Sequence, residues 1–424
     1  MKSSVKDREY DAFRPADNDK SKKAVIIEQG YYNPVPVEMD VQDSFNRLKV
    51  APPHLLFDSS FQYSLQSKVF IQDALIGATI THDSVRAAAR LSCSATPNSR
   101  ARFRSRNYFP YSPAFTNTVT ASFNMQGSVT GITKRIGMYD ENNGYMLEAH
   151  NGIVRVGIRS SIAGSTNYVN QSDWSVDKMD GSGISGISLD ISKQQILVIQ
   201  YQWLGSGQVT FSFSINGQTY PFHKFNHANI LSGLYSKTGT LPVQAEILNT
   251  SGVASYMEFT CCSVVSNGAT AQHGHLHSIS SGVTPKNMPT TGVSYPIISL
   301  RKQSGFTDIP VQILDMNAFS TSQDDFIIQI IHKPTLTGAV WTNVPNSYCQ
   351  KDVSATVATG GDIVAEFYMK GNLQASEKLD QLAKFWDLTL GNDFAGNSEI
   401  MTMSAIPLTT NASMYGVISY KEFE

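Results

Sequence analysis

Charged side chains are scarce in this sequence. Asp, Glu, Lys and Arg make up 16% of its 424 residues, against about 25% in an average globular protein. The formal net charge is -2 at pH 7, so no global field attracts the chain to nucleic acid or to an anionic membrane. An apolar run of about 18 residues, the length that a membrane-spanning helix needs, is also missing. Composition therefore excludes a polybasic nucleic-acid-binding protein and a helical membrane protein.

Cysteine is also rare. The 4 cysteines are too few and too scattered for a disulfide scaffold, and no Cys-x-x-Cys pair is present. The first residues, MKSSVKDREYDAFRP, lack the apolar segment of a secretory signal. We therefore expect a soluble protein made in the cytoplasm without export. Its thiols are expected to be small buried side chains: Cys93, Cys261, Cys262 and Cys349.

Catalytic signatures are missing as well. The sequence has no Gly-x-Ser-x-Gly, no His-Glu-x-x-His and no phosphate-binding loop. A β-sandwich glycosidase needs a pair of carboxylates at the scissile bond, whereas the strands predicted here carry single acids such as Glu148, Glu246 and Glu366. We therefore expect no enzymatic activity.

Alternation of apolar and polar residues is what the sequence has in abundance. Residues 209–215, VTFSFSI, alternate strictly, which predicts a strand with Phe211, Phe213 and Ile215 on its buried face. An Asn-Gly pair follows, the preferred turn of a tight hairpin. Short strands at this spacing, separated by turn residues, predict an all-β chain. We expect two β-sandwich domains, jelly-roll or concanavalin-like, with at most one or two short helices.

The composition changes along the chain and divides it into four parts. Residues 1–45 mix charges of both signs without an apolar period, which predicts an extended N-terminal arm. Residues 267–291 are rich in Gly, Ser, Thr and His and predict a linker. The two sandwich domains are then expected at 46–266 and 292–424. The arm is expected to bind neighbouring subunits through Phe13, Arg14, Tyr31, Tyr32, Pro34 and Pro36.

One segment has a helical period. Residues 377–386 place their large apolar side chains on one face of a helix, and Ser376 is suited to cap its N-terminus. We therefore predict a short helix in the second domain. Its buried face would consist of Leu379, Leu382, Phe385 and Trp386.

Arginine alternates with small or aromatic residues from position 100 to 106. In an extended strand such a row presents its guanidinium groups on one face, where they can pair with carboxylates or phosphates. The same pattern is typical of an edge strand that charge protects against aggregation. We keep both interpretations and expect no sequence-specific binding of nucleic acid. The predicted contacts with an acidic partner are Arg100, Arg102, Arg104 and Arg106.

Three aromatic residues of the first predicted sandwich are candidates for stacking on a sugar ring: Trp174, Tyr201 and Trp203. Tryptophan in a β-sandwich is more often a core residue, so burial in the core is the alternative. The exposure of the three rings decides between the two.

Three histidines, His273, His275 and His277, lie at alternating positions in the predicted linker. In an extended chain they share one face, and three chains around a threefold axis could surround one metal ion with them. The alternative is a solvated linker without a metal. Apart from this ion we expect no cofactor.

Four segments stand out as a set: ITKRIGMYDENNG at 132–144, QSDW with DKMDG at 171–181, YQWLG at 201–205 and LPVQAEILN at 241–249. Together they resemble β-rich structural proteins of large double-stranded DNA phages and viruses, whose fold is a concanavalin- or jelly-roll-like sandwich. Ser206 and the histidine row depart from that pattern. The resemblance implies a virion protein rather than a particular chemistry.

The resemblance implies a structural component of a viral or phage particle, such as a minor capsid, capsid-decorating, fibre or tail protein. Such a protein would act in the virion by assembling with itself, as a homotrimer, and with other virion proteins. The alternative is a receptor- or carbohydrate-binding module on the virion surface that binds a host-surface glycan.

Overall fold

The computed structural model describes two units of the chain. In the first, residues 1–52, it describes two short strands, β1 (Val25–Ile27) and β2 (Val35–Val37), which pair antiparallel with Pro36 opposite Ile26. In the second, it describes residues 53–113, 115–268, 274–372, 374–378, 389–409 and 412–423. The arm residues Phe13, Arg14, Tyr31, Tyr32 and Pro34 lie outside the described residues, so the arm stays a prediction.

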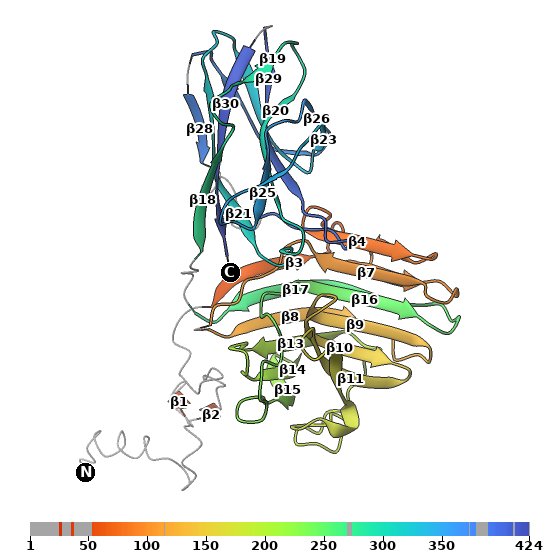
Figure 1. Cartoon of the computed structure of the whole chain (residues 1–424). Helices are drawn as coiled ribbons and strands as arrows, with labels where there is room; N and C mark the ends of the chain where they lie inside the picture. The colour runs from red at the N-terminus through yellow and green to blue at the C-terminus, as the bar shows by residue number, and fades with distance from the viewer. Residues whose placement is uncertain are drawn as a thin grey trace, which may run out of the picture. The chain divides into compact units, whose positions relative to one another are not determined.

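The first half of the second unit is a sandwich of two antiparallel sheets (Figure 1). One sheet has seven strands, in the spatial order β12 (Ser165–Asn170), β11 (Ile153–Ser160), β10 (Gly144–His150), β9 (Ile132–Tyr139), β16 (Val243–Asn249), β7 (Arg100–Ser105) and β4 (Phe70–Leu75). The other has eight strands: β15 (Gln218–Phe225), β14 (Val209–Ile215), β13 (Gln195–Tyr201), β8 (Asn117–Asn124), β17 (Ser255–Ser266), β6 (Ala88–Cys93) and β5 (Thr79–Asp83), with β3 (His54–Ser60) also paired to β17.

Alternating side chains from the two sheets form the core of this sandwich. In β14, Phe211 and Phe213 are 0% exposed and Ile215 packs against the core, which confirms the apolar face predicted for this strand; Thr210 and Ser212 on the other face are buried as well. The Asn216-Gly217 pair turns the chain from β14 into β15, and both residues have a positive φ, as such a hairpin requires.

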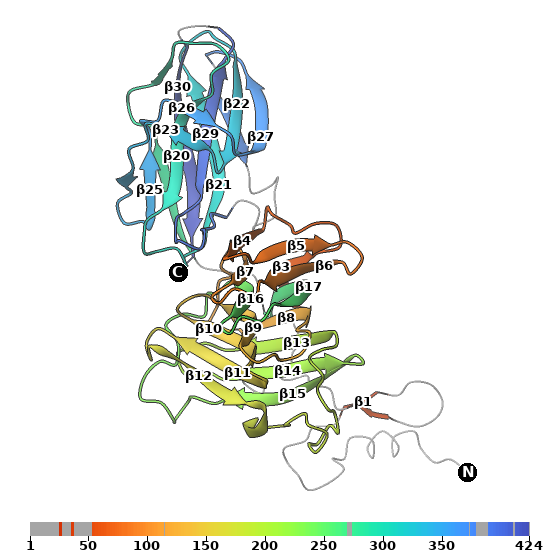
Figure 2. The same ribbon diagram turned by 90° about the vertical axis from the view of Figure 1, so that its right-hand side faces the viewer.

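A second sandwich follows, with its own apolar core (Figure 2). A five-stranded sheet contains β18 (His275–Ser280), β30 (Ala412–Glu422), β21 (Val311–Ser320) and β28 (Gln374–Lys378), with β19 (Lys286–Met288) also paired to β30. A six-stranded sheet contains β24 (Thr342–Asn343), β25 (Cys349–Asp352), β20 (Tyr295–Lys302), β29 (Ile400–Pro407), β22 (Phe326–His332) and β27 (Asp362–Met369). A short ribbon pairs β23 (Thr335–Thr337) with β26 (Val357–Thr359). The predicted all-β class with sandwich domains is confirmed.

Two sequence predictions differ from this structure. The helix predicted for residues 377–386 is wrong at its start, because β28 runs through Ser376 and Lys378 and pairs with β21; the rest of the segment lies outside the described residues. β18 and β19 form inside the predicted linker, where pairing with β30 outweighs the Gly- and Ser-rich composition.

The one helical element in the described segments is a 3-10 turn, η1 (Gln171–Asp173). The described residues contain no helix that is long and apolar enough to cross a membrane.

Candidate binding face on the seven-stranded sheet

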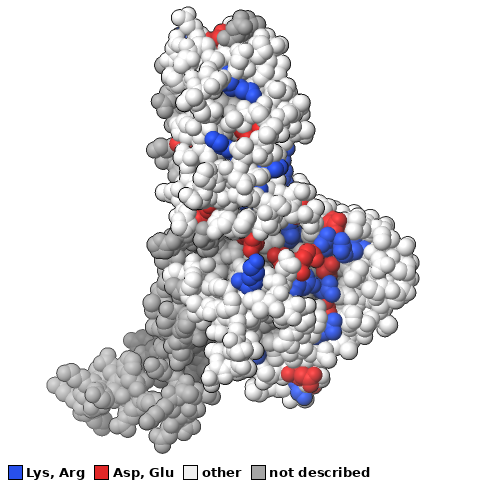
Figure 3. Space-filling model, in the orientation of Figure 1, with Lys and Arg blue, Asp and Glu red and all other residues white. Residues whose placement is uncertain are grey.

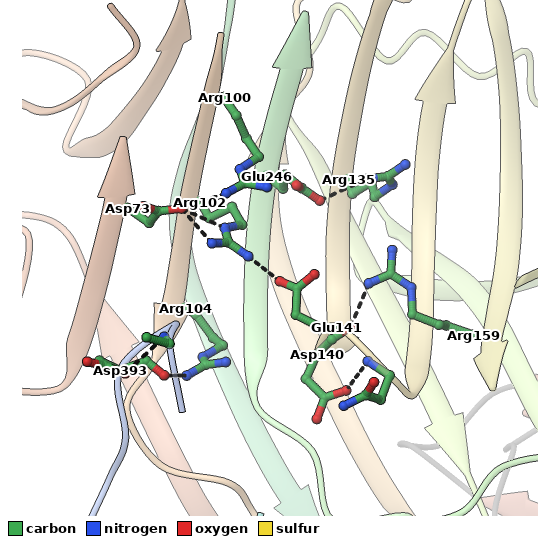
Figure 4. Close-up of polar contacts among 12 residues, drawn as sticks. Asp73, Arg100, Arg102, Arg104, Arg135, Asp140, Glu141, Arg159, Glu246 and Asp393 are labelled. Carbon is green, nitrogen blue, oxygen red and sulfur yellow. Dashed lines mark hydrogen bonds and ion pairs between the residues drawn. The ribbon is translucent and has the colours of Figure 1, made fainter. Parts of the chain in front are cut away.

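One outward-facing residue from each strand of the seven-stranded sheet falls into a single row across it. Directly opposed residues of antiparallel strands point to the same face, so the register alone assembles the row. From β4 to β12 its members are Asp73, Arg102, Glu246, Arg135, Glu148, Arg155 and Asn170. The charges alternate in sign over the first six strands. We call this set the charged row; Figure 4 shows four of its members, Asp73, Arg102, Glu246 and Arg135.

Arg135 on β9 is the centre of the charged row. Its guanidinium pairs with Glu246 on one side, at 2.8 Å, and with Glu148 on the other. Burial opposes the charge of Arg135, but Glu246 and Glu148 raise its pKa above the ordinary value. Burial by itself would raise the pKa of the Glu148 carboxyl, and Arg135 and Arg155 reverse that and lower it. Both groups are therefore charged at neutral pH.

An aromatic ring caps the β11–β12 end of the charged row. Arg155 donates to Glu148 at 2.6 Å and lies over the ring of Tyr168, 3.8 Å from its centroid. The hydroxyl of Tyr168 donates to Glu148 at 2.9 Å. The ring lies over Gly157, where an added Cβ would be 2.7 Å from it, so glycine is needed for this close approach. Tyr168 is thereby fixed at the end of the row.

A loop of the second sandwich covers Arg102 and Arg104 near the β4–β7 end of the charged row. Asp73 pairs with Arg102 at 2.6 Å and with Arg100 at 3.1 Å. Phe394 lies over the guanidinium groups of Arg102 and Arg104, at 4.3 and 4.6 Å from ring centroid to Cζ. Arg102 therefore keeps only 9% exposure, whereas the side chains of Arg155 and Arg135 keep 21% and 16%.

Charged side chains of both signs form one patch on this face of the molecule, over β7, β16 and β9 (Figure 3). The patch combines guanidinium donors and carboxylate acceptors whose positions are fixed by their mutual hydrogen bonds. Such pairs lose little further entropy when a ligand binds. The surface can therefore offer a polar ligand many donors and acceptors at fixed places.

The four predicted arginines find their partners inside the chain. β7 pairs with both β16 and β4, so it is an interior strand and the edge-strand interpretation is wrong. Arg100 and Arg102 join the charged row at Asp73. Arg104 donates to the carbonyls of Asn392 and Asp393, and Arg106 pairs with Glu399.

The three predicted sugar-stacking rings are turned toward the interior. Trp174 is 4% exposed and Tyr201 is 0% exposed, and both belong to the core of the first sandwich. Trp203 packs against that core and donates from Nε1 to the carbonyl of Ser236 at 2.9 Å. The stacking prediction is wrong for these residues, because Tyr201 faces the core from the end of β13 and the two tryptophans pack against the same core from outside the strands.

The predicted histidine site is divided between described and undescribed residues. His273 lies outside the described residues, while His275 and His277 share one face of β18. His277 pairs with Glu422 at 3.2 Å and stacks on Tyr420. The described part of the chain contains no group of three or more His, Cys, Asp or Glu that could hold a metal ion.

Comparison with known proteins gives structural matches only. No family model matches the chain, and no curated protein matches it. The chain is similar to a glycosyl hydrolase family protein of Mycobacterium fortuitum, with 11% identity over 50% of this chain and 99% of that one and a TM-score of 0.35. It is similar to a glycoside hydrolase family 16 endo-glucanase of Bacteroides ovatus, with 11% identity over 50% and 100% of the chains and a TM-score of 0.34.

A third structure comes from work on endo-acting O-glycanases with which human gut microbiota initiate mucin breakdown; it has 11% identity over 50% of this chain and 99% of that one, with a TM-score of 0.37. At these identities the likeness is one of fold alone. It nevertheless contradicts two predictions. The expectation of no enzymatic activity is contradicted by these structural neighbours, which include glycoside hydrolases. The virion, phage and capsid assignments have no support, since these neighbours are bacterial enzymes.

Proposed function

We propose that this chain binds a glycan on the outward face of the seven-stranded sheet, with the part of the charged row from Arg135 to the capping Tyr168 as the contact surface. The observation that carries the proposal is the fixed alternation of guanidinium and carboxylate groups, which ends at a packed tyrosine ring. Arg135, Arg155 and Tyr168 would make the central contacts.

The chemistry of a sugar suits this surface. Each hydroxyl group both donates and accepts a hydrogen bond, so it matches sites where a donor and an acceptor lie side by side. Arg135 and Glu246 are such neighbours, with side chains that keep 16% and 8% exposure. Tyr168 adds an aromatic ring, whose face suits the C–H groups of a pyranose. A neutral row of mixed charges favours a polyhydroxylated ligand over a highly charged one.

Glycan cleavage is a second candidate, and one observation favours it. Glu148 and Glu246 are buried carboxylates on strands that flank β9, and both bind the same guanidinium of Arg135. Retaining glycosidases use two carboxylates about 5–5.5 Å apart, one as nucleophile and one as acid. Arg135 and Arg155 keep Glu148 ionised, which suits the nucleophile, but they also occupy its lone pairs. Binding is therefore the first candidate.

A glycan array followed by titration calorimetry on the full chain tests the binding proposal. Tyr168→Ala should weaken binding of the best glycan by about tenfold or more, since stacking and the hydrogen bond to Glu148 are both lost. Tyr63→Ala is the matched control, because Tyr63 is 87% exposed and lies outside the charged row. An array without any bound glycan, or unchanged affinity in Tyr168→Ala, would refute the proposal.

Release of reducing ends from the same glycan tests cleavage. If the second candidate holds, Glu148→Gln should abolish turnover and leave binding within about threefold of the wild type, because glutamine keeps the shape but cannot act as a nucleophile. Binding without any turnover by the wild type rejects cleavage and leaves the binding proposal standing.

A further inference from the structure

The eight-stranded sheet of the first sandwich has a polar pocket on its outward face. The pocket has a volume of about 440 Å³ and lies where β6, β8 and β17 run side by side, next to the turn that precedes β13. β17 is bulged between Phe259 and Cys261 at this place, and bulges often redirect side chains beside functional sites. The pocket opens from the sheet opposite to the one that carries the charged row.

The floor of the pocket is the carboxylate of Glu258, whose negative charge is balanced by two arginines. Glu258 has a side chain only 4% exposed, and Arg86 binds both of its oxygens, at 2.9 and 3.0 Å. Arg90 binds Glu258 as well, at 2.8 Å, and also pairs with Asp83. Each of these carboxylates has a guanidinium partner, so the floor has no unpaired negative charge.

Lys193 therefore gives the pocket a positive excess. It lies in the turn before β13, which Asp190 fixes by accepting from the backbone N–H and the hydroxyl of Ser192, at 2.9 and 2.6 Å. Among the described residues Lys193 takes part in no ion pair, and its side chain is exposed at the pocket rim. An anionic group of a ligand would find an exposed ammonium group here, whose charge, after the hydrogen bonds from Ser192, also helps to lower the pKa of the nearby Asp190 carboxyl.

The remaining lining offers hydrogen bonds rather than apolar contact. The amide nitrogen of Gln194 donates to the hydroxyls of Ser122 and Thr260, both at 2.9 Å, which fixes the orientation of the amide and leaves its oxygen as an acceptor. Asn124 and Gln126 add two more amides to the wall. This lining suits a ligand that carries several hydroxyl groups and one negative charge.

We infer that this pocket binds a carboxylate-bearing sugar, such as a single hexuronic acid residue. Its carboxylate would pair with Lys193 and with the exposed side of Arg86, and its hydroxyls would bond to the amides of Gln194 and Asn124. Inorganic anions match the charge but not the amides, and neutral sugars match the amides but not the charge. The inference is independent of the charged row, since the two surfaces lie on opposite sheets.

Calorimetric titration of the full chain with glucuronic acid, glucose and inorganic phosphate tests the inference. Glucuronic acid should bind at least about tenfold more tightly than either of the other two. Lys193→Gln should reduce the affinity for glucuronic acid to that for glucose, because the charge is lost while the side chain remains polar and exposed. Lys224→Gln is the matched control, an exposed lysine on β15 of the same sheet, and should change nothing.

Equal binding of glucose and glucuronic acid would overturn the inference, and so would phosphate binding as tight as that of glucuronic acid. Unchanged affinity in Lys193→Gln would overturn it too. Loss of glucuronic acid binding in Tyr168→Ala would place the sugar on the charged row instead. Failure of the array experiment on Tyr168 leaves this pocket untouched, so the two tests can fail separately.

Discussion

Lys134 and Arg135 are neighbours in the sequence and face opposite sides of β9. Arg135 lies on the outward face and has two carboxylate partners, whereas Lys134 is turned inward and is 1% exposed. The ammonium group of Lys134 donates only to carbonyls, those of Met125 at 2.5 Å and Gly127 at 3.3 Å. Burial lowers the pKa of Lys134 from 10.5 to about 8. The environment thus stabilises one cation and destabilises the other.

Lys134 predicts a pH dependence of stability. Between pH of about 8 and 10.5 the unfolded chain still holds the proton that the folded chain has lost, so the free energy of unfolding should rise with pH. Lys134→Met removes this contribution. Its free energy of unfolding should therefore rise by roughly 2–3 kcal/mol less than that of the wild type over this pH range. Chemical unfolding at intervals across this range measures the difference between the two proteins.

The exposed Lys224 provides the control for this measurement. Lys224→Met should follow the wild-type curve. A constant offset between Lys134→Met and the wild type over the whole range would show that Lys134 is not held in its neutral form in the folded protein.

At the scale of elements, the sequence predicted β14 correctly and β28 wrongly for related reasons. Strict alternation in β14 identifies the face that packs into the core, although Thr210 and Ser212 on its other face are buried as well. In the segment that begins at β28 the apolar spacing favours a helix, but the strand pairs with β21 from Asp315 to Phe319. Pairing with a strand distant in the sequence overrides local preference.

The charged row could not be predicted from sequence for the same reason. Glu148 and Glu246 each look like a single charge in an apolar strand, and Arg135 and Glu246 are 111 residues apart. Only the register of the sheet brings them together. The sequence does indicate that each of these residues takes an outward position in its strand. Only the order and register of the strands, which the sequence does not show, would have aligned them.

Phe213 tests the packing of β14. Its ring stacks on that of Phe222 with centroids 4.9 Å apart, and it is fully buried. Phe213→Ala should lower the free energy of unfolding by about 3–5 kcal/mol, because the removed ring leaves a cavity. Ser214→Ala, one position on and pointing to the other face, should cost less than about 0.5 kcal/mol. Similar losses in both variants by chemical unfolding would contradict the register.

For the molecule as a whole, one buried cluster connects the two sandwiches. Glu399, which precedes β29, pairs with Arg106 of the first sandwich at 3.0 Å and with His332 of the second at 3.0 Å. It also pairs with Lys333 at 2.8 Å and accepts from the backbone N–H of Gly391. Burial opposes the charge of Glu399, but the hydrogen bond from His332 and the charges of Arg106 and Lys333 lower its pKa from 4.5 to about 2.

Glu399 should therefore couple the unfolding of the two sandwiches. Glu399→Gln leaves Arg106 buried without its counter-charge, a change that costs about 3–5 kcal/mol in buried pairs. We expect calorimetry at neutral pH to resolve two transitions in the variant where the wild type has one.

The stabilisation by Glu399 is present above pH 4.5 and is lost as the pH falls toward about 2. The free energies of unfolding of the variant and the wild type should therefore converge over that interval. Asp362→Asn, an exposed change on β27, should keep a single transition at every pH. A single transition in Glu399→Gln, or a difference from the wild type that stays constant down to pH of about 2, would mean that this carboxylate does not hold the sandwiches together.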